Sequence, residues 1–391
     1  MNLPTTLLTS ACLCAAANAG AAEWSAAPVL NWTLDHDTNR LLTTEGQASE
    51  GGYLQFDLLL RRATGASSLS LQPHVEWQRY TERAAQNTNN QSLRAAGSWR
   101  DDRSVLEAEA SYVRDNALNN QLADTGFITG DTERRAKDAA LSWSYERSDR
   151  NTLSVQASYS DVGYQRNQAY TLLGYKYPSV AVTQSLEWSP RTAMELMAYA
   201  SRLIPEGAAA DSDSIGARIG FSRALTTRIH AFFSAGLSRQ IVAGRSESAS
   251  AAGSPSQSES GYIGRFELTR DHVNGRWRLF AERSISASGY GSLVTRNDVG
   301  LSFDWRLSPR WSATFGLRSL RNEDIALSTS GERRRYERAE AGFGWQATRM
   351  WRVNATVAST RARQAESSPL VAGWNARVSA TWSPQRRLVS R

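Results

Sequence analysis

From Val29 to Trp382 the sequence repeats one pattern: segments of about ten residues that alternate apolar and polar side chains, separated by polar connections. In one segment, Leu301 and Phe303 alternate with Ser302 and Asp304. Successive side chains of a β-strand point to opposite faces, so one face of such a segment suits lipid and the other suits water. The pattern predicts an all-β chain folded as a single antiparallel transmembrane β-barrel.

About 18 such segments can be placed, an even number as expected for a bacterial barrel. They lie at 29–36, 51–62, 68–80, 91–100, 104–115, 137–147, 152–165, 179–189, 193–204, 215–223, 228–241, 260–270, 276–288, 297–307, 311–322, 337–347, 351–363 and 372–382. The segment 193–204 separates its apolar and polar residues least cleanly, which leaves a barrel of about 16 strands as an alternative.

Short and long connections alternate strictly along the chain. Asp101-Asp102-Arg103 and Ser189-Pro190-Arg191 are examples of the short class, with the Asp, Pro and Ser residues that tight turns favour. The long class includes the Gly-, Ser- and Ala-rich stretch 242–259. The alternation predicts short periplasmic turns, long external loops and both chain ends on the periplasmic side.

Tryptophan placement is consistent with this topology. An indole ring prefers the headgroup level of a bilayer, and one group of tryptophans falls near the short turns or the chain end. We expect these residues to form the periplasmic aromatic girdle: Trp99, Trp188, Trp305, Trp311, Trp345, Trp351 and Trp382.

Hydropathy excludes a helical membrane protein, because no apolar run of 18 residues follows the N-terminal segment. The mean hydropathy is −0.47, yet the chain carries 13 Trp and 13 Tyr, which is unusual for a soluble domain. A barrel reconciles both facts, because its strands show only every second residue to lipid.

The N-terminus has the features of a secretory leader. An apolar stretch from Leu7 to Ala17 precedes Ala17-Asn18-Ala19, a small-x-small cleavage pattern, and we expect cleavage after Ala19 or Ala22. The predicted organisation is a signal peptide at 1–22 followed by a barrel domain at 23–391. Both cysteines, Cys12 and Cys14, lie in the leader, so the mature chain has no thiol.

The formal charge of +7 comes almost wholly from arginine. These arginines are scattered along the chain, and this spacing argues against a nucleic-acid partner. The expected partners are outer-membrane lipid and lipopolysaccharide, together with the barrel assembly machinery.

A resemblance to a known group rests on several short motifs between Tyr112 and Tyr164: Val113-Arg114-Asp115-Asn116, Asp124-Thr125-Gly126, Ser142-Trp143-Ser144-Tyr145-Glu146-Arg147-Ser148-Asp149-Arg150 and Ala157-Ser158-Tyr159-Ser160-Asp161-Val162-Gly163-Tyr164. The chain resembles proteobacterial outer-membrane β-barrel proteins found with exopolysaccharide or exosortase (PEP-CTERM) systems. The resemblance implies an outer-membrane barrel, with polysaccharide export components as partners. The chain departs from common barrels in continuing from Ser383 to Arg391 after its last aromatic residue, Trp382.

Enzymatic motifs are missing from the sequence. It contains no GxSxG, HExxH, phosphate loop or dinucleotide fingerprint. Of the four histidines only His36, beside Asp35 and Asp37, is placed near an external strand end where a rim hydrolase would need it. Asp35, Asp37 and Asn39 lack the Gly and distal Glu of a calcium loop. We therefore predict no enzyme, no cofactor and no metal site.

The inward face of the predicted barrel is rich in charge. The expected lumen-lining residues are Arg94, Glu107, Glu109, Glu187, Arg218, Arg265, Glu267, Arg278, Glu282, Asp304, Arg306, Arg318, Glu340, Arg352 and Arg377. Cross-strand pairs in a water-filled lumen without selectivity are the favoured explanation, and an anion-attracting conduit is the alternative. Any constriction would have to come from an infolded loop such as 116–136 or 242–259.

Two functions follow. The first is a passive outer-membrane pore or conduit, which the resemblance would connect with surface polysaccharide export. The second is a closed structural or assembly-associated barrel whose external loops contact cell-surface polymers.

Overall fold

The structure is a computed structural model that describes residues 22–81, 87–116, 132–165, 172–207, 210–243, 257–324, 333–363, 367–384 and 387–389. The predicted signal peptide lies outside these residues except for Ala22, so the leader and its cleavage sites stay predictions. Within the described residues, no helix is both long and apolar enough to cross a bilayer.

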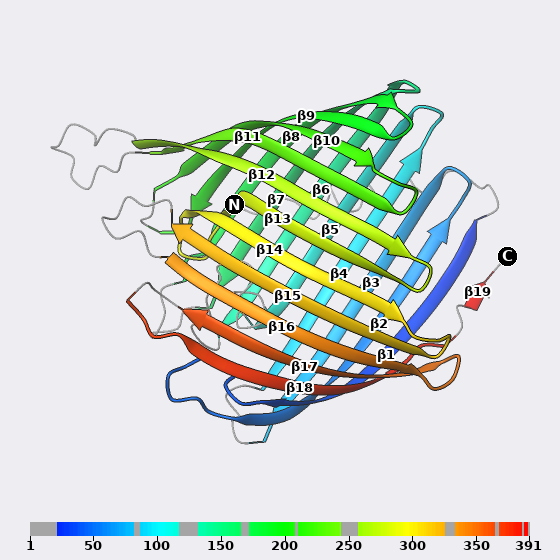
Figure 1. Cartoon of the computed structure of the whole chain (residues 1–391), viewed down its shortest axis with the longest axis vertical. Helices are drawn as coiled ribbons and strands as arrows, with labels where there is room; N and C mark the ends of the chain where they lie inside the picture. The colour runs from blue at the N-terminus through cyan, green and yellow to red at the C-terminus, as the bar shows by residue number, and fades with distance from the viewer. Residues whose placement is uncertain are drawn as a thin grey trace, which may run out of the picture.

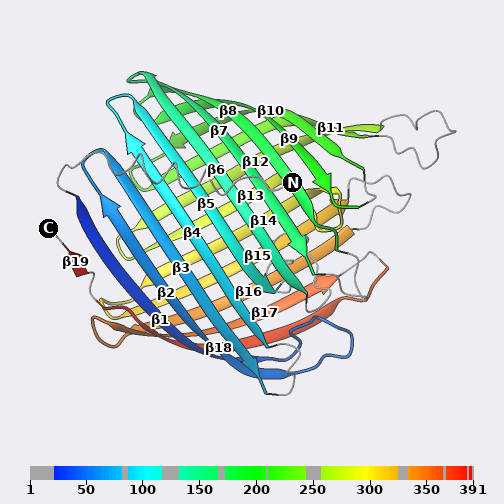
Figure 2. The ribbon, with the colours of Figure 1, turned by 180° about the vertical axis from the view of Figure 1, so that it is seen from behind.

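The described chain forms one antiparallel sheet that closes into a barrel (Figures 1 and 2). Its strands are β1 (Glu23–Asp37), β2 (Ser49–Ala63), β3 (Ser67–Tyr80), β4 (Thr88–Arg100), β5 (Ser104–Asn116), β6 (Glu133–Ser148), β7 (Asn151–Tyr164), β8 (Tyr175–Ser189), β9 (Thr192–Pro205), β10 (Ser212–Ala224), β11 (Ile229–Val242), β12 (Gln257–His272), β13 (Gly275–Ala287), β14 (Leu293–Arg306), β15 (Trp311–Asp324), β16 (Arg333–Gln346), β17 (Trp351–Arg363), β18 (Val371–Trp382) and β19 (Arg387–Val389). Each of β1 to β18 pairs with the next along the chain. Pairing of β1 with β18 closes the barrel, and β19 adds to the start of β1.

The prediction of an 18-strand barrel is confirmed, and the alternative of 16 strands is wrong. The ambiguous segment 193–204 is β9, which pairs along its length with β8 and β10. Its faces look mixed in the sequence because Met197 and Tyr199 point inward, opposite Arg218 and Gly216 on β10. An inward face that packs internally can carry apolar residues, so polarity alone identifies it poorly.

The two classes of connection lie at opposite ends of the barrel. The short turns gather at the end that also carries β19, on the right of Figure 1. They are closed by local bonds such as Leu307 N to Trp311 O at 2.9 Å. The longer connections lie at the opposite end, which we call the long-loop end.

This arrangement predicts which side of the membrane each connection faces. A tag inserted at Ser250, in a long connection outside the described residues, should be reached by antibody on intact cells. A tag at Asp149, in the β6–β7 turn, should be reached only after the outer membrane is permeabilised. The reverse labelling would invert the orientation.

Cross-strand pairing assigns every residue to one of two faces. Large apolar side chains with high exposure fall on one face, for example Leu237 at 73% and Tyr262 at 66%. The other face carries most of the buried polar residues, including Asp35, Glu76 and Asp298. We call the second face inward, because its residues from β2 to β5 and from β16 and β18 line one cavity inside the barrel.

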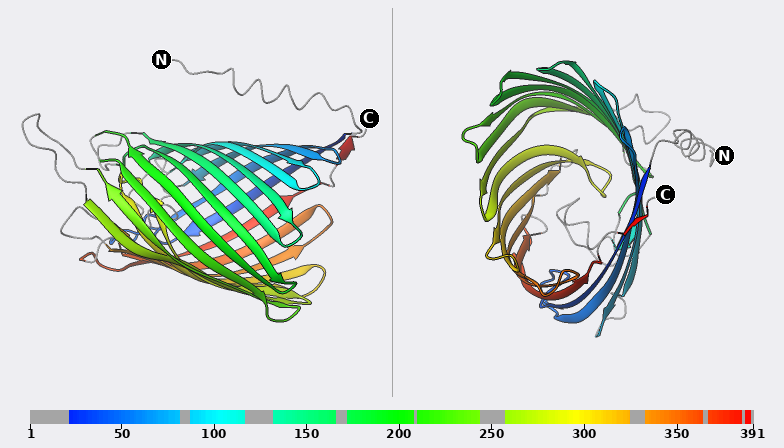
Figure 3. Two further views of the ribbon diagram at one scale, coloured as in Figure 1. Left: turned by 90° about the horizontal axis from the view of Figure 1, so that it is seen from above. Right: turned by 90° about the vertical axis from the view of Figure 1, so that its right-hand side faces the viewer.

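The wall is not uniform at the long-loop end. β12 pairs with β13 only from the His272/Gly275 pair up to the Gly264/Arg283 pair, although β12 itself runs on to Gln257. β13 and β14 stay paired with each other to their ends. Their shared tip, residues 284–294, therefore leaves the wall, and in the view along the barrel the yellow hairpin reaches into the interior (Figure 3, right).

Candidate functional site: the barrel interior

The structure places all fifteen predicted lumen residues on the inward face. Arg278 lies opposite Ser302, and Glu107 lies opposite Ser142, each pair on the inward set of its strands. The predicted set omits Glu76, Asp298 and Arg338, which also point inward. The alternation of the strands could have identified them. Asp298 is an even number of residues from Asp304 on β14, and Arg338 is an even number of residues from Glu340 on β16, so each pair shares a face. Whether these residues contact a solute stays a prediction.

Inward carboxylates clearly outnumber inward arginines on one half of the barrel, whereas arginines are in modest excess on the other half. Carboxylates predominate on β1 to β9, the near wall in Figure 2: Asp35, Asp37, Asp57, Glu76, Glu107, Glu109, Asp115, Asp138, Glu187 and Glu195. Arginines are in modest excess on β10 to β18, the near wall in Figure 1: Arg218, Arg265, Arg276, Arg278, Arg296, Arg306, Arg318, Arg334, Arg338, Arg352 and Arg377. The same half also carries inward carboxylates: Glu259, Glu267, Asp271, Glu282, Asp298, Asp304, Asp324 and Glu340. We call these halves the acidic wall and the arginine wall.

Several arginines of the arginine wall are neutralised within it. Arg318 binds Asp298 through two hydrogen bonds, Nε to Oδ1 at 2.9 Å and Nη2 to Oδ2 at 2.6 Å. Arg265 and Arg278 both donate to Glu267 Oε2, at 2.6 and 2.8 Å. These bidentate and shared pairs are the strong form of ion pair, and they tie neighbouring strands together.

Other arginines of this wall have no such partner. Arg352 donates to Ser312 Oγ at 2.9 Å and to Asn354 Oδ1 at 3.0 Å, both neutral groups. Within the described part of the chain, no carboxylate forms an ion pair with Arg218, Arg306 or Arg352. The wall therefore keeps positive charge that faces the lumen.

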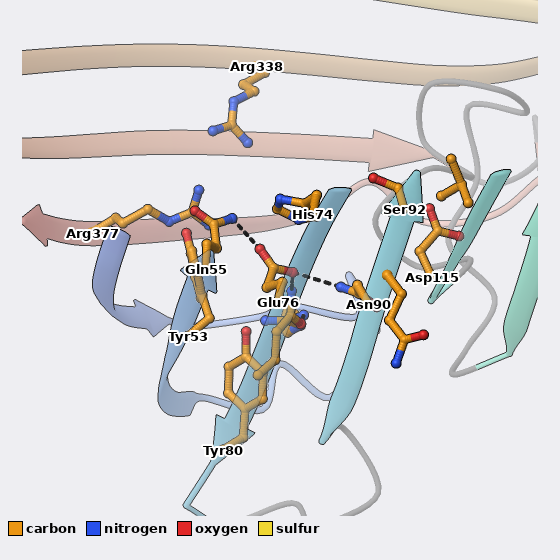
Figure 4. A pocket seen from close by; sticks show the side chains of 14 residues that line it. Tyr53, Gln55, His74, Glu76, Tyr80, Asn90, Ser92, Asp115, Arg338 and Arg377 are labelled. Carbon is orange, nitrogen blue, oxygen red and sulfur yellow. Dashed lines mark hydrogen bonds between the residues drawn. The ribbon is translucent and has the colours of Figure 1, made fainter. Parts of the chain in front are cut away.

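A polar cavity of about 570 Å³ lies between the two walls (Figure 4). Glu76 projects into it and accepts hydrogen bonds from Asn90 Nδ2 at 2.7 Å and from the side-chain amides of Gln55 and Gln78. Arg338 and Arg377 line the same cavity from β16 and β18. Charges of both signs thus face one space.

The connection 38–48 closes part of the long-loop end. Arg40 reaches into the interior, where its guanidinium lies 4.1 Å from the ring centre of Tyr80 and donates to Gln78 Oε1 at 3.2 Å. Burial lowers the pKa of Arg40, although the nearby Asp35 and Asp37 act in the opposite direction. Leu42 adopts a φ of 47°. Its side chain packs in a buried cluster with Leu320, Tyr336 and Ala362, which come from β15, β16 and β17.

The β13–β14 tip closes another part of the same end. Leu293 packs across the interior with Ala136, Val162, Tyr175 and Leu203, which come from β6 to β9. We call these residues the tip cluster. They are 0 to 7% exposed, a degree of burial typical of a protein core.

Further contacts fix the very end of the tip. Gly289 O accepts from Leu173 N at 2.8 Å, and the Arg334 guanidinium lies 4.5 Å from the ring centre of Tyr290. Within the described residues, the long-loop end is therefore narrowed by this hairpin together with the connection 38–48. The predicted candidates, 116–136 and 242–259, fall largely outside the described residues.

The predicted girdle tryptophans lie at the short-turn end of their strands and on the outward face. Trp99, Trp188, Trp305, Trp311, Trp345 and Trp351 are 38 to 59% exposed, and Trp382 is half-buried. Trp311 stacks on Trp345 with ring centres 5.6 Å apart. Their position fits a headgroup-level belt, although contact with lipid stays a prediction.

Residues of the types found in a hydrolytic triad also meet on the acidic wall, in a combination that the sequence pattern does not reveal. His74 Nδ1 lies 2.8 Å from Asp57 Oδ1, and Ser92 lies directly opposite His74 on β4. A hydrolytic triad also needs a hydrogen bond from the serine to the histidine, and the described hydrogen bonds include none between Ser92 and His74. His36, the predicted rim candidate, lies 3.3 Å from Glu50 on the outward face. Among the described residues no three His, Cys, Asp or Glu side chains gather as a metal site.

Comparison with known proteins gives the fold. No protein-family model matches the sequence, and no curated protein matches it. OccK9 (OpdG) of Pseudomonas aeruginosa matches with a TM-score of 0.52 and 11% identity, over 92% of this chain and 98% of that one. The unliganded ferric citrate transporter FecA matches at 0.50 and 8%, over 91% of this chain and 78% of that one. The match to the copper transporter OprC has a TM-score of 0.48 and 10% identity and covers 86% of this chain and 61% of that one.

The chain is thus an outer-membrane 18-strand β-barrel of the architecture shared by porins and transport receptors. Its location in the outer membrane follows from that architecture. The predicted association with exopolysaccharide systems finds no support in these comparisons and stays a prediction.

Proposed function

We propose that this outer-membrane barrel is a passive conduit for small charged solutes, constricted at its long-loop end by the β13–β14 tip. The observation that carries the proposal is the uneven division of inward charge across one polar lumen, with carboxylates in excess on the acidic wall and arginines in excess on the arginine wall. A solute that carries an acidic group would pass along the arginine wall, by the same attraction that charged rings exert in other channels.

Removing positive charge from the arginine wall should make the channel less anion-selective. In Arg306→Gln/Arg352→Gln, two arginines without a carboxylate partner lose their charge, and the reversal potential in a salt gradient should shift toward that of a cation-selective pore. Planar-bilayer recording of wild type and variant measures the shift.

The matched control is Arg270→Gln, which removes the same charge from the outward face of β12. It should leave the reversal potential unchanged. Equal reversal potentials for wild type and double variant, with open channels in both, would contradict the proposed role of the arginine wall.

The resemblance described above leads us to propose acidic sugars of a surface polysaccharide system as cargo. Arginines bind carboxylates and phosphates with bidentate geometry, which suits such a cargo better than a neutral one. Blockade of the open channel by uronic-acid oligosaccharides, and not by neutral oligosaccharides of equal length, would support this assignment.

The second candidate is a closed structural barrel, and the packing of the β13–β14 tip favours it. A buried apolar cluster that spans the interior is expected to be a stable feature, and a permanently fixed tip would block passage. We propose no enzymatic role in either case, since none of the described hydrogen bonds activates Ser92.

A further inference from the structure

A row of arginines crosses the outward face of the barrel near its long-loop end. Arg321 on β15 lies directly opposite Arg335 on β16, and Arg335 lies directly opposite Arg363 on β17. Arg283 and Asn297 continue the row onto β13 and β14. We call Arg321, Arg335 and Arg363 the arginine row. Like charges directly opposite on neighbouring strands destabilise a sheet, so a bound anion would stabilise this one.

The described residues supply little negative charge at the row. Glu337 pairs with Arg335, two residues along β16. Glu323, on the same outward face of β15, adds one further carboxylate. Within the described part of the chain, no carboxylate forms an ion pair with Arg321 or Arg363. Arg363 Nε is also buried without a hydrogen-bond partner.

An apolar groove of about 460 Å³ lies directly beside the row, toward the short-turn end. Leu279, Val299, Leu301 and Leu317 line it, and Ala339 is small enough to leave the face hollow. Glu337 and Arg361 form the part of its lining nearest the arginine row. The groove is therefore aliphatic along most of its length and charged at one end.

The depth of the row matches a membrane interface. Trp311, in the predicted girdle, and Arg321 are about ten residues apart on β15, or roughly 34 Å of strand. A tilt of about 40° reduces this to about 26 Å along the membrane normal, close to the ~25 Å apolar band of outer-membrane barrels. The arginine row thus lies at headgroup level in the outer leaflet, and the groove lies within the hydrocarbon.

We propose that the arginine row and the groove bind one molecule of the phosphorylated, multiply acylated glycolipid of the outer leaflet. The phosphates lie on Arg321, Arg335 and Arg363, and one acyl chain lies in the groove. Guanidinium groups bind phosphate through paired hydrogen bonds, and three adjacent arginines match a doubly phosphorylated headgroup better than a phospholipid with a single phosphate. A second copy of the barrel would present the same positive charge and be repelled.

The test measures glycolipid retained by the detergent-purified full barrel, using native mass spectrometry with bisphosphorylated lipid A as the probe. Wild type should retain one molecule, and Arg321→Gln/Arg335→Gln/Arg363→Gln should lose at least about tenfold in affinity, because phosphate contacts from several arginines are removed. Wild type should lose affinity to the same extent for the dephosphorylated lipid, a comparison that needs no variant.

Matched controls separate this site from general surface charge. Arg114 and Arg202 face outward but already pair with Glu133 and Asp211, at 2.6 and 2.8 Å. Arg114→Gln and Arg202→Gln should therefore retain the glycolipid. Ala339→Leu should weaken retention by filling the groove, whereas Ala157→Leu, on the outward face of β7, should not.

Stability in neutral lipid distinguishes a ligand site from a structural one. In phosphatidylcholine vesicles the triple variant should resist urea at least as well as wild type, because it removes like charges from facing positions. Equal retention of lipid A by wild type and triple variant would overturn the proposal. Equal affinity of wild type for phosphatidylglycerol and lipid A would overturn the assignment of the glycolipid as occupant.

Discussion

Replacing residues 286–294 with an Asn-Gly turn should raise the single-channel conductance of the barrel several-fold. Ile285 and Thr295 are direct cross-strand partners, so a two-residue turn can join them without distorting β13 or β14. The change removes the part of the tip that reaches across the interior to the tip cluster. Barrels of about 16 to 18 strands without an obstruction leave an aqueous channel, and planar-bilayer recording would show it as larger open steps.

A second deletion tests the other predicted constriction. Val242 and Gln257 are also direct partners, so Asn-Gly can replace residues 243–256 in the same way. If this variant opens the pore and the tip deletion does not, the constriction lies in that connection. If neither variant conducts although both are folded, the closed structural barrel is the better description.

A variant that carries substitutions instead of the deletion separates two effects on conductance, the loss of packing and the shortening of the chain. Leu203→Glu/Leu293→Glu places two charges in the tip cluster, where the native side chains are 0 and 3% exposed. Burying such charges is unfavourable, so the tip should detach and the conductance should rise as in the deletion. Ser302→Glu adds a charge to the inward face of β14 outside the tip cluster and should change conductance much less.

The strands and their faces were predictable because both depend on a period of two. Once Leu301 and Phe303 are assigned to lipid, the faces of the neighbouring strands follow from the short turns that join them. This is why the whole predicted lumen set lies on one face. The same alternation also assigns Asp298 and Arg338 to the lumen. The pattern was therefore sufficient to predict them, although the predicted set left them out.

The inward tip was not predicted, because alternation describes only strands with one lipid face and one water face. Leu293 and Val294 are adjacent and point to opposite faces, yet both are almost fully buried, at 3 and 0% exposure. Consecutive apolar residues at a strand start, after Gly289 and Gly291, are the local sign of a segment buried on both sides. The partners of that segment lie on β6 to β9, and no local pattern specifies such a long-range contact.

The division of charge between the walls also depends on closure of the barrel. Along the sequence, arginines and carboxylates are intermingled, and the outward arginines at positions 321, 335 and 363 look like those inside. Only after alternate residues are assigned to opposite faces does the inward excess of carboxylates on β1 to β9, and of arginines on β10 to β18, become visible. The arginine row becomes visible for the same reason, since its members are brought together by cross-strand register.

A pair of adjacent substitutions tests the face assignment on which these conclusions depend. Leu301 lies on the outward face of β14, about four residues from the girdle residue Trp305 and thus near the middle of the membrane. Leu301→Arg should destabilise the barrel by roughly 2 to 4 kcal/mol, the cost of an arginine facing lipid near the midplane. Urea titrations of folding into phosphatidylcholine vesicles measure this cost.

Ser302→Arg introduces the same side chain one residue later, on the inward face. It should cost at most about 1 kcal/mol, chiefly from the like charge of Arg278 directly opposite. Because strand periodicity is two, a register error of one residue would exchange the two results. If Ser302→Arg proves the more damaging substitution, β14 presents its other face to lipid, and both the arginine wall and the groove lose their basis on this strand.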